Sequence, residues 1–281
     1  MIYVGTSGYS FRSWRGVFYP RALGARERLR FYFRHFNCLE LNTSFYNDRP
    51  AAAAEGVAAE ALPGCAVTVK LHHSLTHQAF PGAASVRAFA ACLSPLRATG
   101  SLAAVLAQFP QSFTNREPCR RHLAALADAL ADDRLVVEFR HRSWARDSVL
   151  EWLRDLDVSF CCVDEPELPS LMPRLAAVTG PVAYVRLHGR NAVTWYSSSA
   201  NRDRYDYLYT EAELAYWVRA VRAMHDEADR VFLFTNNCYT GKAVINARMF
   251  QKLLQLGEQE AAGAISVPAV HGPDLARLPA P

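Results

Sequence analysis

Short apolar runs alternate along this chain with amphipathic segments, and eight of the runs end in polar or charged residues. Each run predicts a buried strand. Between the runs, apolar residues recur at spacings of three and four, which places them on one face of a helix, as in the segment from Leu214 to Val221. The eight runs begin at Ile2, Leu39, Val67, Val105, Val136, Phe160, Val182 and Val231.

Strands that alternate with helices indicate right-handed crossovers and parallel strands. Eight such units in 281 residues match a closed barrel, which typically needs about 250 residues. The alternative is an open doubly wound sheet, which usually binds phosphate through a glycine-rich turn that Gly5-Thr6-Ser7-Gly8 does not match. We predict an α/β protein of one domain, a closed (β/α)8 TIM barrel over residues 1–257. A C-terminal tail, residues 258–281, is expected to wrap the surface or to be partly disordered.

Polar pairs end four of the predicted strands. Residues i and i+2 of a strand point to the same face, and the residue between each pair is apolar. We expect the apolar residue to pack against the helices and the pair to point into the barrel near its C-terminal mouth, where active sites lie in this fold. The pairs are Glu40 with Asn42, Lys70 with His72, Glu138 with Arg140, and Arg186 with His188, and Gln108, Asp164, Asn236 and Asn237 end other strands.

These strand ends carry charges of both signs. Buried groups of opposite charge can neutralise one another and shift one another's pKa values, as acid–base catalysis requires. The same set would also fit a salt-bridged plug without chemistry. The candidate catalytic residues are Glu40, Lys70, Glu138, Asp164 and His188, and the candidate substrate-binding residues are Ser7, Tyr9, Trp14, Asn42, His72, His77, Gln108, Arg140, Trp144, Arg186, Asn236 and Asn237.

The loops after the strands are rich in aromatic residues, including Tyr9, Trp14 and Trp144. Arginine, aromatic and asparagine side chains around a basic mouth suit a planar or phosphorylated ligand, although each ring taken alone fits packing of a loop against a helix better. His77 could help to bind an anion at a helix start. The long polar segment over residues 190–210 could form a lid.

Composition restricts the partners and the compartment. The net charge of +4 gives weak support for a polyanionic partner such as nucleic acid. Seven cysteines without a C-x-x-C motif argue against a disulfide framework and against a thiolate zinc site. No apolar run is long enough for a membrane span, and the N-terminus has no signal-peptide pattern. We expect a cytoplasmic monomer or weak oligomer with no membrane partner.

Lysine is rare in this chain, because 28 of the 31 basic residues are arginine. Lys70 lies inside a predicted strand and is therefore unusual. A divalent metal is compatible with the acidic and histidine residues at the strand ends, but no cofactor is certain. No local ligand spacing such as H-E-x-x-H occurs, and basic neighbours would repel an ion.

Three classes of function fit these residues. The first is a phosphodiesterase-like hydrolase or another enzyme that acts on a small anionic or phosphorylated substrate, a nucleotide or a nucleic acid. Arg140, Arg186 and Lys70 would hold the anion, a carboxylate would be the general base, and His188 would be the acid or a hydrogen-bond donor. The second is a lyase or aldolase that forms a Schiff base on Lys70. The third is a non-catalytic protein that binds a ligand or nucleic acid.

Motifs spread over about residues 2–256 resemble one family. They are Gly5–Ser10, Trp14–Pro20, Phe36–Tyr46, Val69-Lys70, Thr76-His77, Gln108–Phe113, Val137–Trp144, Tyr184–Gly189, Tyr205–Tyr209, and Asn236-Asn237 with Gly241, Ala243, Asn246 and Ala247. Together they resemble the domain of unknown function 72 (DUF72), or YecE-like, family.

The resemblance implies a TIM barrel and no settled reaction. Members have been likened to metal-dependent endonuclease barrels, an analogy of fold and site shape. The chain departs from the family pattern at Pro110-Gln111, where two prolines are usual. It departs again at Cys238, where an acidic residue often follows the asparagine pair. The second departure removes one candidate metal ligand or base.

Overall fold

Eight parallel strands form a closed barrel in the computed structural model, which describes residues 1–46, 50–78, 82–196 and 201–256. Each strand pairs with the next along the chain, and β8 pairs with β1 to close the ring. The predicted TIM barrel is confirmed, whereas the predicted tail over residues 258–281 lies outside the described residues. The strands are β1 (Ile2–Ser7), β2 (Cys38–Leu41), β3 (Ala66–Lys70), β4 (Leu102–Gln108), β5 (Leu135–Glu138), β6 (Ser159–Asp164), β7 (Val182–Leu187) and β8 (Arg230–Thr235).

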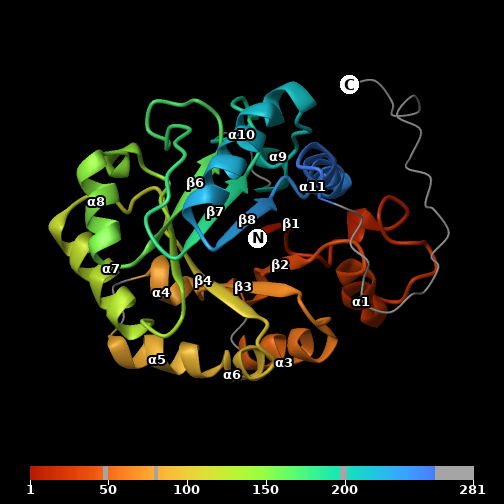
Figure 1. Cartoon of the computed structure of the whole chain (residues 1–281), viewed down its shortest axis with the longest axis horizontal. Coiled ribbons are helices and arrows are strands. Elements are labelled where there is room, and N and C mark those ends of the chain that lie inside the picture. Colours follow the sequence, from red (N-terminus) through yellow and green to blue (C-terminus); the bar gives the residue numbers. More distant parts are fainter. Residues whose placement is uncertain (47–49, 79–81, 197–200, 257–281) are drawn as a thin grey trace.

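Helices surround the ring of strands (Figure 1). The connection from β6 to β7 is the exception, since residues 165–181 contain no helix. Pro166, Pro169 and Pro173 lie in this connection, and proline lacks the N–H that a helix interior needs. The α-helices are α1 (Arg28–Phe33), α2 (Thr43–Tyr46), α3 (Pro50–Glu60), α4 (His73–Thr76), α5 (Ala83–Ala91), α6 (Ser94–Ala98), α7 (Glu117–Ala129), α8 (Asp147–Asp155), α9 (Asn201–Arg204), α10 (Glu211–Glu227) and α11 (Lys242–Leu253).

Four short 3-10 helices lie in the described loops. They are η1 (Arg12–Trp14), η2 (Ala25–Glu27), η3 (Arg142–Trp144) and η4 (Tyr239–Gly241). Helix α10 shows how the local sequence sets a boundary. The Thr210 hydroxyl accepts from the Glu213 N–H, and the Glu213 carboxylate accepts from the Thr210 N–H at 2.8 Å. This capping box satisfies two N–H groups that a helix start otherwise leaves unpaired.

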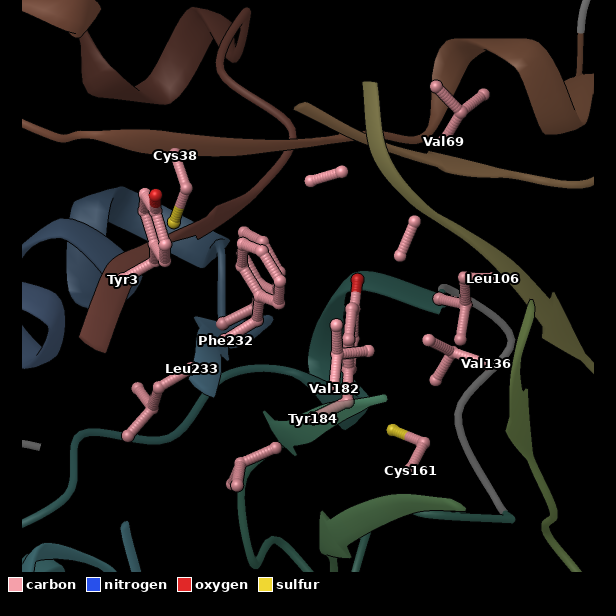
Figure 2. Packing of buried hydrophobic residues seen from close by; sticks show 14 of the residues in the cluster. Tyr3, Cys38, Val69, Leu106, Val136, Cys161, Val182, Tyr184, Phe232 and Leu233 are labelled. Carbon is pink, nitrogen blue, oxygen red and sulfur yellow. The ribbon is translucent and has the colours of Figure 1, made fainter. Parts of the chain in front are cut away.

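Apolar side chains fill the N-terminal end of the barrel interior. The rings of Tyr3 and Phe232 stack with their centroids 4.9 Å apart. Figure 2 shows Tyr184 with Phe232 on one side and Cys161 and Val136 on the other. The Tyr184 hydroxyl marks the change from apolar packing to the polar layer at the C-terminal strand ends.

Strands β1 and β2 approach each other closely at Gly5. A Cβ atom there would lie 2.3 Å from the Cys38 carbonyl oxygen, so any larger residue would force the strands apart. Ser7 pairs in register with Glu40 two positions further along. Gly5 therefore helps to set the height at which Glu40 enters the barrel.

Candidate functional site

An ion-paired network crosses the interior of the barrel near its C-terminal mouth. Arg186 on β7 donates from Nη2 to Glu40 Oε1 on β2 at 2.7 Å, and from Nη1 to Glu138 on β5. The Tyr184 hydroxyl donates to Glu40 Oε2 at 2.7 Å and lies 2.8 Å from the Thr68 hydroxyl. All five side chains are buried. The predicted convergence of Glu40, Glu138 and Arg186 in the interior is confirmed.

Arg140 links this network to a second carboxylate. Its Nε lies 2.6 Å from Glu138 Oε1, and its Nη1 donates to Glu165 Oε2 at 3.2 Å. The other Glu165 oxygen accepts from the Met172 N–H at 3.0 Å. Burial raises the pKa of Glu165 to about 7, although Arg140 partly offsets this. Glu165 can therefore hold a proton near neutral pH, and the sequence analysis missed it.

The neighbouring cations lower the pKa values of both Glu138 and His188, which favours a charged carboxylate and a neutral imidazole. Burial alone would raise the pKa of Glu138, but Arg140 and Arg186 outweigh burial and hold that pKa well below its usual value. Burial, with Arg140, lowers the pKa of His188 to about 3. His188 Nε2 lies 3.3 Å from Glu138 Oε1, and its Nδ1 lies 2.9 Å from the Asn236 amide nitrogen. His188 is therefore a neutral ring at physiological pH.

Lys70 is the titratable cation of the site. Its Nζ donates to Gln108 Oε1 at 2.6 Å and lies 3.7 Å from the centre of the Phe45 ring. No carboxylate among the described residues lies within ion-pair distance of this nitrogen. Burial and the positive charge of Arg186 lower the pKa of Lys70 to about 7, against partial compensation by Glu138. A buried lysine without a carboxylate partner costs stability whenever it is protonated.

Replacement of Lys70 by Met should change the pH dependence of stability. The pKa is about 7 in the folded state and near 10.5 in the unfolded chain. The unfolded state therefore binds more protons between these values, and stability rises with pH in that window. From pH 7 to pH 9 the wild type should gain about 2 kcal/mol of unfolding free energy relative to Lys70→Met.

Urea unfolding at both pH values measures this gain. Lys252→Met is the matched control, because the side chain of Lys252 is 79% exposed and its loss should leave the pH dependence unchanged. Parallel pH profiles of the wild type and Lys70→Met would contradict the buried, depressed lysine.

Three predicted binding residues lie at or near the ends of β1 and β2. Ser7 ends β1, Tyr9 lies two residues after it, and Asn42 directly follows β2. The Ser7 hydroxyl accepts a long hydrogen bond of 3.4 Å from Arg186 Nη2. Tyr9 is half-buried, and its carbonyl oxygen accepts from the Tyr19 hydroxyl at 2.7 Å. Asn42 is also half-buried, and its Oδ1 has no hydrogen-bond partner in the described part of the chain. Only Ser7 of the three touches the central network.

His77 and Tyr205 lie around the mouth. The His77 ring is 5.0 Å from the Phe45 ring, and burial together with the charge of Lys70 lowers its pKa to about 4. The Tyr205 ring is 6.3 Å from His188. The described part of the 190–210 segment therefore reaches the site, whereas residues 197–200 lie outside the described residues.

Asp164 does not join the network, contrary to the prediction. Its carboxylate accepts two hydrogen bonds of 2.7 Å from Arg190, one of 2.9 Å from the Tyr209 hydroxyl, and one of 2.7 Å from Trp217 Nε1 on α10. It therefore points outward to the helices. The next residue, Glu165, has the inward orientation because successive residues of an extended chain face opposite sides.

Trp14 and Trp144 are packing residues here, not exposed stacking surfaces. Both are fully buried. The Nε1 of Trp14 donates to the Cys238 carbonyl at 2.9 Å, and that of Trp144 donates to the Phe113 carbonyl at 2.7 Å. The Trp144 ring stacks on Phe139 with centroids 4.2 Å apart. Each indole has its polar group satisfied inside the fold, so the expected substrate contacts are not available.

Asn237 and His72 also lie outside the central network, although both are predicted binding residues. The Asn237 amide donates to Asn246 Oδ1 on α11 at 2.8 Å, which places it outside the barrel. His72 caps α4, where its Nδ1 accepts from the Ser74 N–H at 3.3 Å. Its side chain lines a surface pocket with residues of α4 and α5. The chain turns at the end of β3, so the side chains of Lys70 and His72, two residues apart, need not point the same way.

The geometry offers no metal site in the described part of the chain. No group of three or more His, Cys, Asp or Glu side chains there is placed to hold an ion. Glu40 and Glu138, the inward carboxylates among the expected ligands, are each engaged by Arg186.

No helix in the described residues is long and apolar enough to cross a membrane.

A closed ring of eight parallel strands, with its ionisable residues gathered at the carboxyl ends, defines the class of this chain as a TIM-barrel α/β protein. Within that class it belongs to the DUF72 family, described as a protein of unknown function, whose family model matches residues 3–270. The resemblance noted from sequence motifs is confirmed.

Similar proteins include one relative in sequence and two solved structures with this fold. The chain is 28% identical over 272 residues to the UPF0759 protein YunF of Bacillus subtilis, covering 91% of this chain and 95% of that protein. A crystal structure of a DUF72 family protein from Thermotoga maritima matches with a TM-score of 0.85 and 36% identity, covering 91% and 99%. A crystal structure of a DUF72 family protein from Enterococcus faecalis matches with a TM-score of 0.82 and 25% sequence identity. The match covers 95% of this chain and 100% of that chain.

Proposed function

We propose that the protein is an enzyme that binds a small anionic substrate, such as a phosphorylated compound or a carboxylate, through Lys70 and Arg140. The observation that carries this proposal is the unused N–H groups of these two cations. The described contacts of Arg140 occupy Nε and Nη1 and leave Nη2, and Lys70 donates once, to Gln108. Arg186 directs both terminal nitrogens to Glu40, Glu138 and Ser7, which favours a structural role for it.

The titration of the site supports proton transfer as part of the reaction. The pKa values of Lys70 and Glu165 both lie at about 7. Groups with pKa values near the working pH are the most effective general acids and bases. Glu138, with its low pKa, is better suited to hold the arginines than to accept a proton. Phosphodiesters, nucleotides and nucleic acid ends all fall within the proposed substrate class.

Binding of small anions should depend on Lys70. A charged hydrogen bond contributes about 1.5–3 kcal/mol, so Lys70→Met should weaken binding by about ten- to a hundredfold. Calorimetry with inorganic phosphate, pyrophosphate, sugar phosphates, nucleoside monophosphates and oxalate provides the measurement. Lys252→Met should bind as the wild type does, because that side chain is exposed.

Three results would count against the proposal. Equal affinities of wild type and Lys70→Met would place the anion elsewhere, and a wild type that binds none of these anions would remove the substrate class. Binding without turnover of any bound compound would indicate a binding protein instead of an enzyme.

A further inference from the structure

Lys70 occupies a setting that differs from those of the other two lysines. Lys242 is ion-paired with Asp206 at 2.5 Å, and Lys252 is 79% exposed. Lys70 is 7% exposed and lies at the end of β3, inside the mouth. Its described neighbours are an amide oxygen, an aromatic ring and the ion-paired arginines, with the carboxylates of Glu138 and Glu40 beyond ion-pair distance.

The Gln108 amide is fixed in one orientation. Its Nε2 donates to the Phe109 carbonyl oxygen at 2.8 Å, so its Oε1 must face Lys70. An amide oxygen can accept a hydrogen bond from a protonated amine and also from a neutral one. One N–H of Lys70 therefore stays bound when the amine is neutral, which leaves the nitrogen lone pair free to point elsewhere. A carboxylate in place of Gln108 would instead have favoured the protonated form.

We propose that Lys70 is a covalent nucleophile, which forms an imine with a small aldehyde or ketone that carries a carboxylate or phosphate group. The proposal rests on the proposed function, because Arg140 would bind the anionic group through Nη2, which the described contacts leave unused. The Phe45 ring, 3.7 Å from Nζ, covers one side of the nitrogen and limits access of water. Burial beside other cations is the setting in which lysine acts as a nucleophile at neutral pH.

The chemistry needs no further reactant. The neutral Lys70 nitrogen attacks the carbonyl carbon, a C–N bond forms, and the carbonyl π electrons move to oxygen, which takes a proton. The nitrogen loses one proton, and the carbinolamine hydroxyl then leaves as water after a second protonation. The iminium nitrogen that results loses its last proton. Amine and carbonyl thus give one imine and one water. Glu165 is the carboxyl of the network that can hold a proton near neutral pH.

Reductive trapping tests the proposal on the whole protein. The protein is treated with glyoxylate and cyanoborohydride at pH 7, and adducts at the three lysines are quantified by peptide mass spectrometry. We expect Lys70 to be labelled at least tenfold faster than Lys242 and Lys252, because its pKa of about 7 leaves a large fraction of it neutral at that pH. Inorganic phosphate should slow this labelling, and propanal, which has no anionic group, should label Lys70 more slowly than glyoxylate.

A substitution at Gln108 supplies the matched variant. Gln108→Glu keeps the size of the side chain but sets a carboxylate against Nζ, which should hold Lys70 protonated. Labelling of Lys70 at pH 7 should fall at least tenfold, and the pH at which labelling is half-maximal should rise. Unchanged labelling in this variant would contradict the role assigned to Gln108 and to the free lone pair.

The outcomes separate this proposal from the proposed function. If calorimetry showed binding of phosphate and glyoxylate but Lys70 were not labelled preferentially, the imine would be overturned. The proposed anion site would still stand. Equal labelling of Lys70 by glyoxylate and propanal would overturn the anionic carbonyl substrate. Absence of both binding and preferential labelling would overturn both proposals.

Discussion

Glu138→Gln is expected to destabilise the folded protein by about 3–5 kcal/mol, because it leaves buried positive charge without its partner. Glu138 is fully buried and contacts Arg140 Nε at 2.6 Å, Arg186 Nη1 and the His188 ring. Glutamine has nearly the same shape, but its amide carries no charge and turns N–H groups towards guanidinium donors. Glu40 and Glu165 then remain as the only carboxylates paired with the two arginines among the described residues.

Urea unfolding at pH 7 measures this loss, and Glu117→Gln is its matched control. Glu117 forms an ion pair with Arg121 at 3.1 Å, but both side chains are about two thirds exposed. An exposed pair of this kind contributes only about 0–1 kcal/mol. If Glu138→Gln cost no more than Glu117→Gln, the network would not be the stabilising centre that its contacts indicate.

Asp164→Asn should cost about 2–4 kcal/mol, since its carboxylate accepts four hydrogen bonds from buried or partly buried donors. An asparagine amide would set its own N–H groups against the Arg190 guanidinium or the Trp217 indole. The substitution would also loosen Tyr209, whose hydroxyl accepts from the Gly189 N–H at 2.8 Å. The loop after β7 should therefore lose its anchor to α10.

Thermal and urea unfolding of Asp164→Asn can be compared with those of Glu167→Gln. Glu167 shares Arg174 with Asp164 but is 80% exposed, so its loss should cost about 0–1 kcal/mol. A small effect at Asp164 would mean that the four donors find other acceptors. Amide hydrogen exchange would show the same contrast, with faster exchange of the Gly189 N–H in Asp164→Asn only.

The fold could be predicted because the apolar runs and the intervening amphipathic segments are regular. The central site could also be predicted in part. Glu138 and Arg140 belong to one polar pair with Phe139 between them, and the spacing of two fixes their shared direction once Phe139 packs outward. The same argument placed Arg186 correctly at the end of β7.

The sixth strand shows where this argument fails. Phe160, Cys161, Cys162 and Val163 are all apolar, so the pattern does not say which positions face inward. The Cys161 thiol lies 3.7 Å from Glu138, which fixes the odd-numbered residues to the interior. Asp164 must then face the helices, a result that the sequence alone does not contain.

The predictions for Trp14 and Trp144 fail for a different reason. A loop tryptophan can stack on a ligand or pack within the fold, and the choice depends on which carbonyl group lies near its Nε1. For Trp14 that group belongs to Cys238, more than two hundred residues away. Tyr184 could have been found, because it precedes Arg186 by two residues and therefore shares its face.

The pairing of β1 with β8 has a consequence for self-association. Every described strand has a neighbour on both sides, so the sheet presents no free row of backbone N–H and C=O groups to another molecule. Fibre growth by strand addition would first require the cylinder to break open. Any assembly of folded copies must instead use the helices or the loops. Substitutions on those surfaces would leave the closed ring of strand pairs intact.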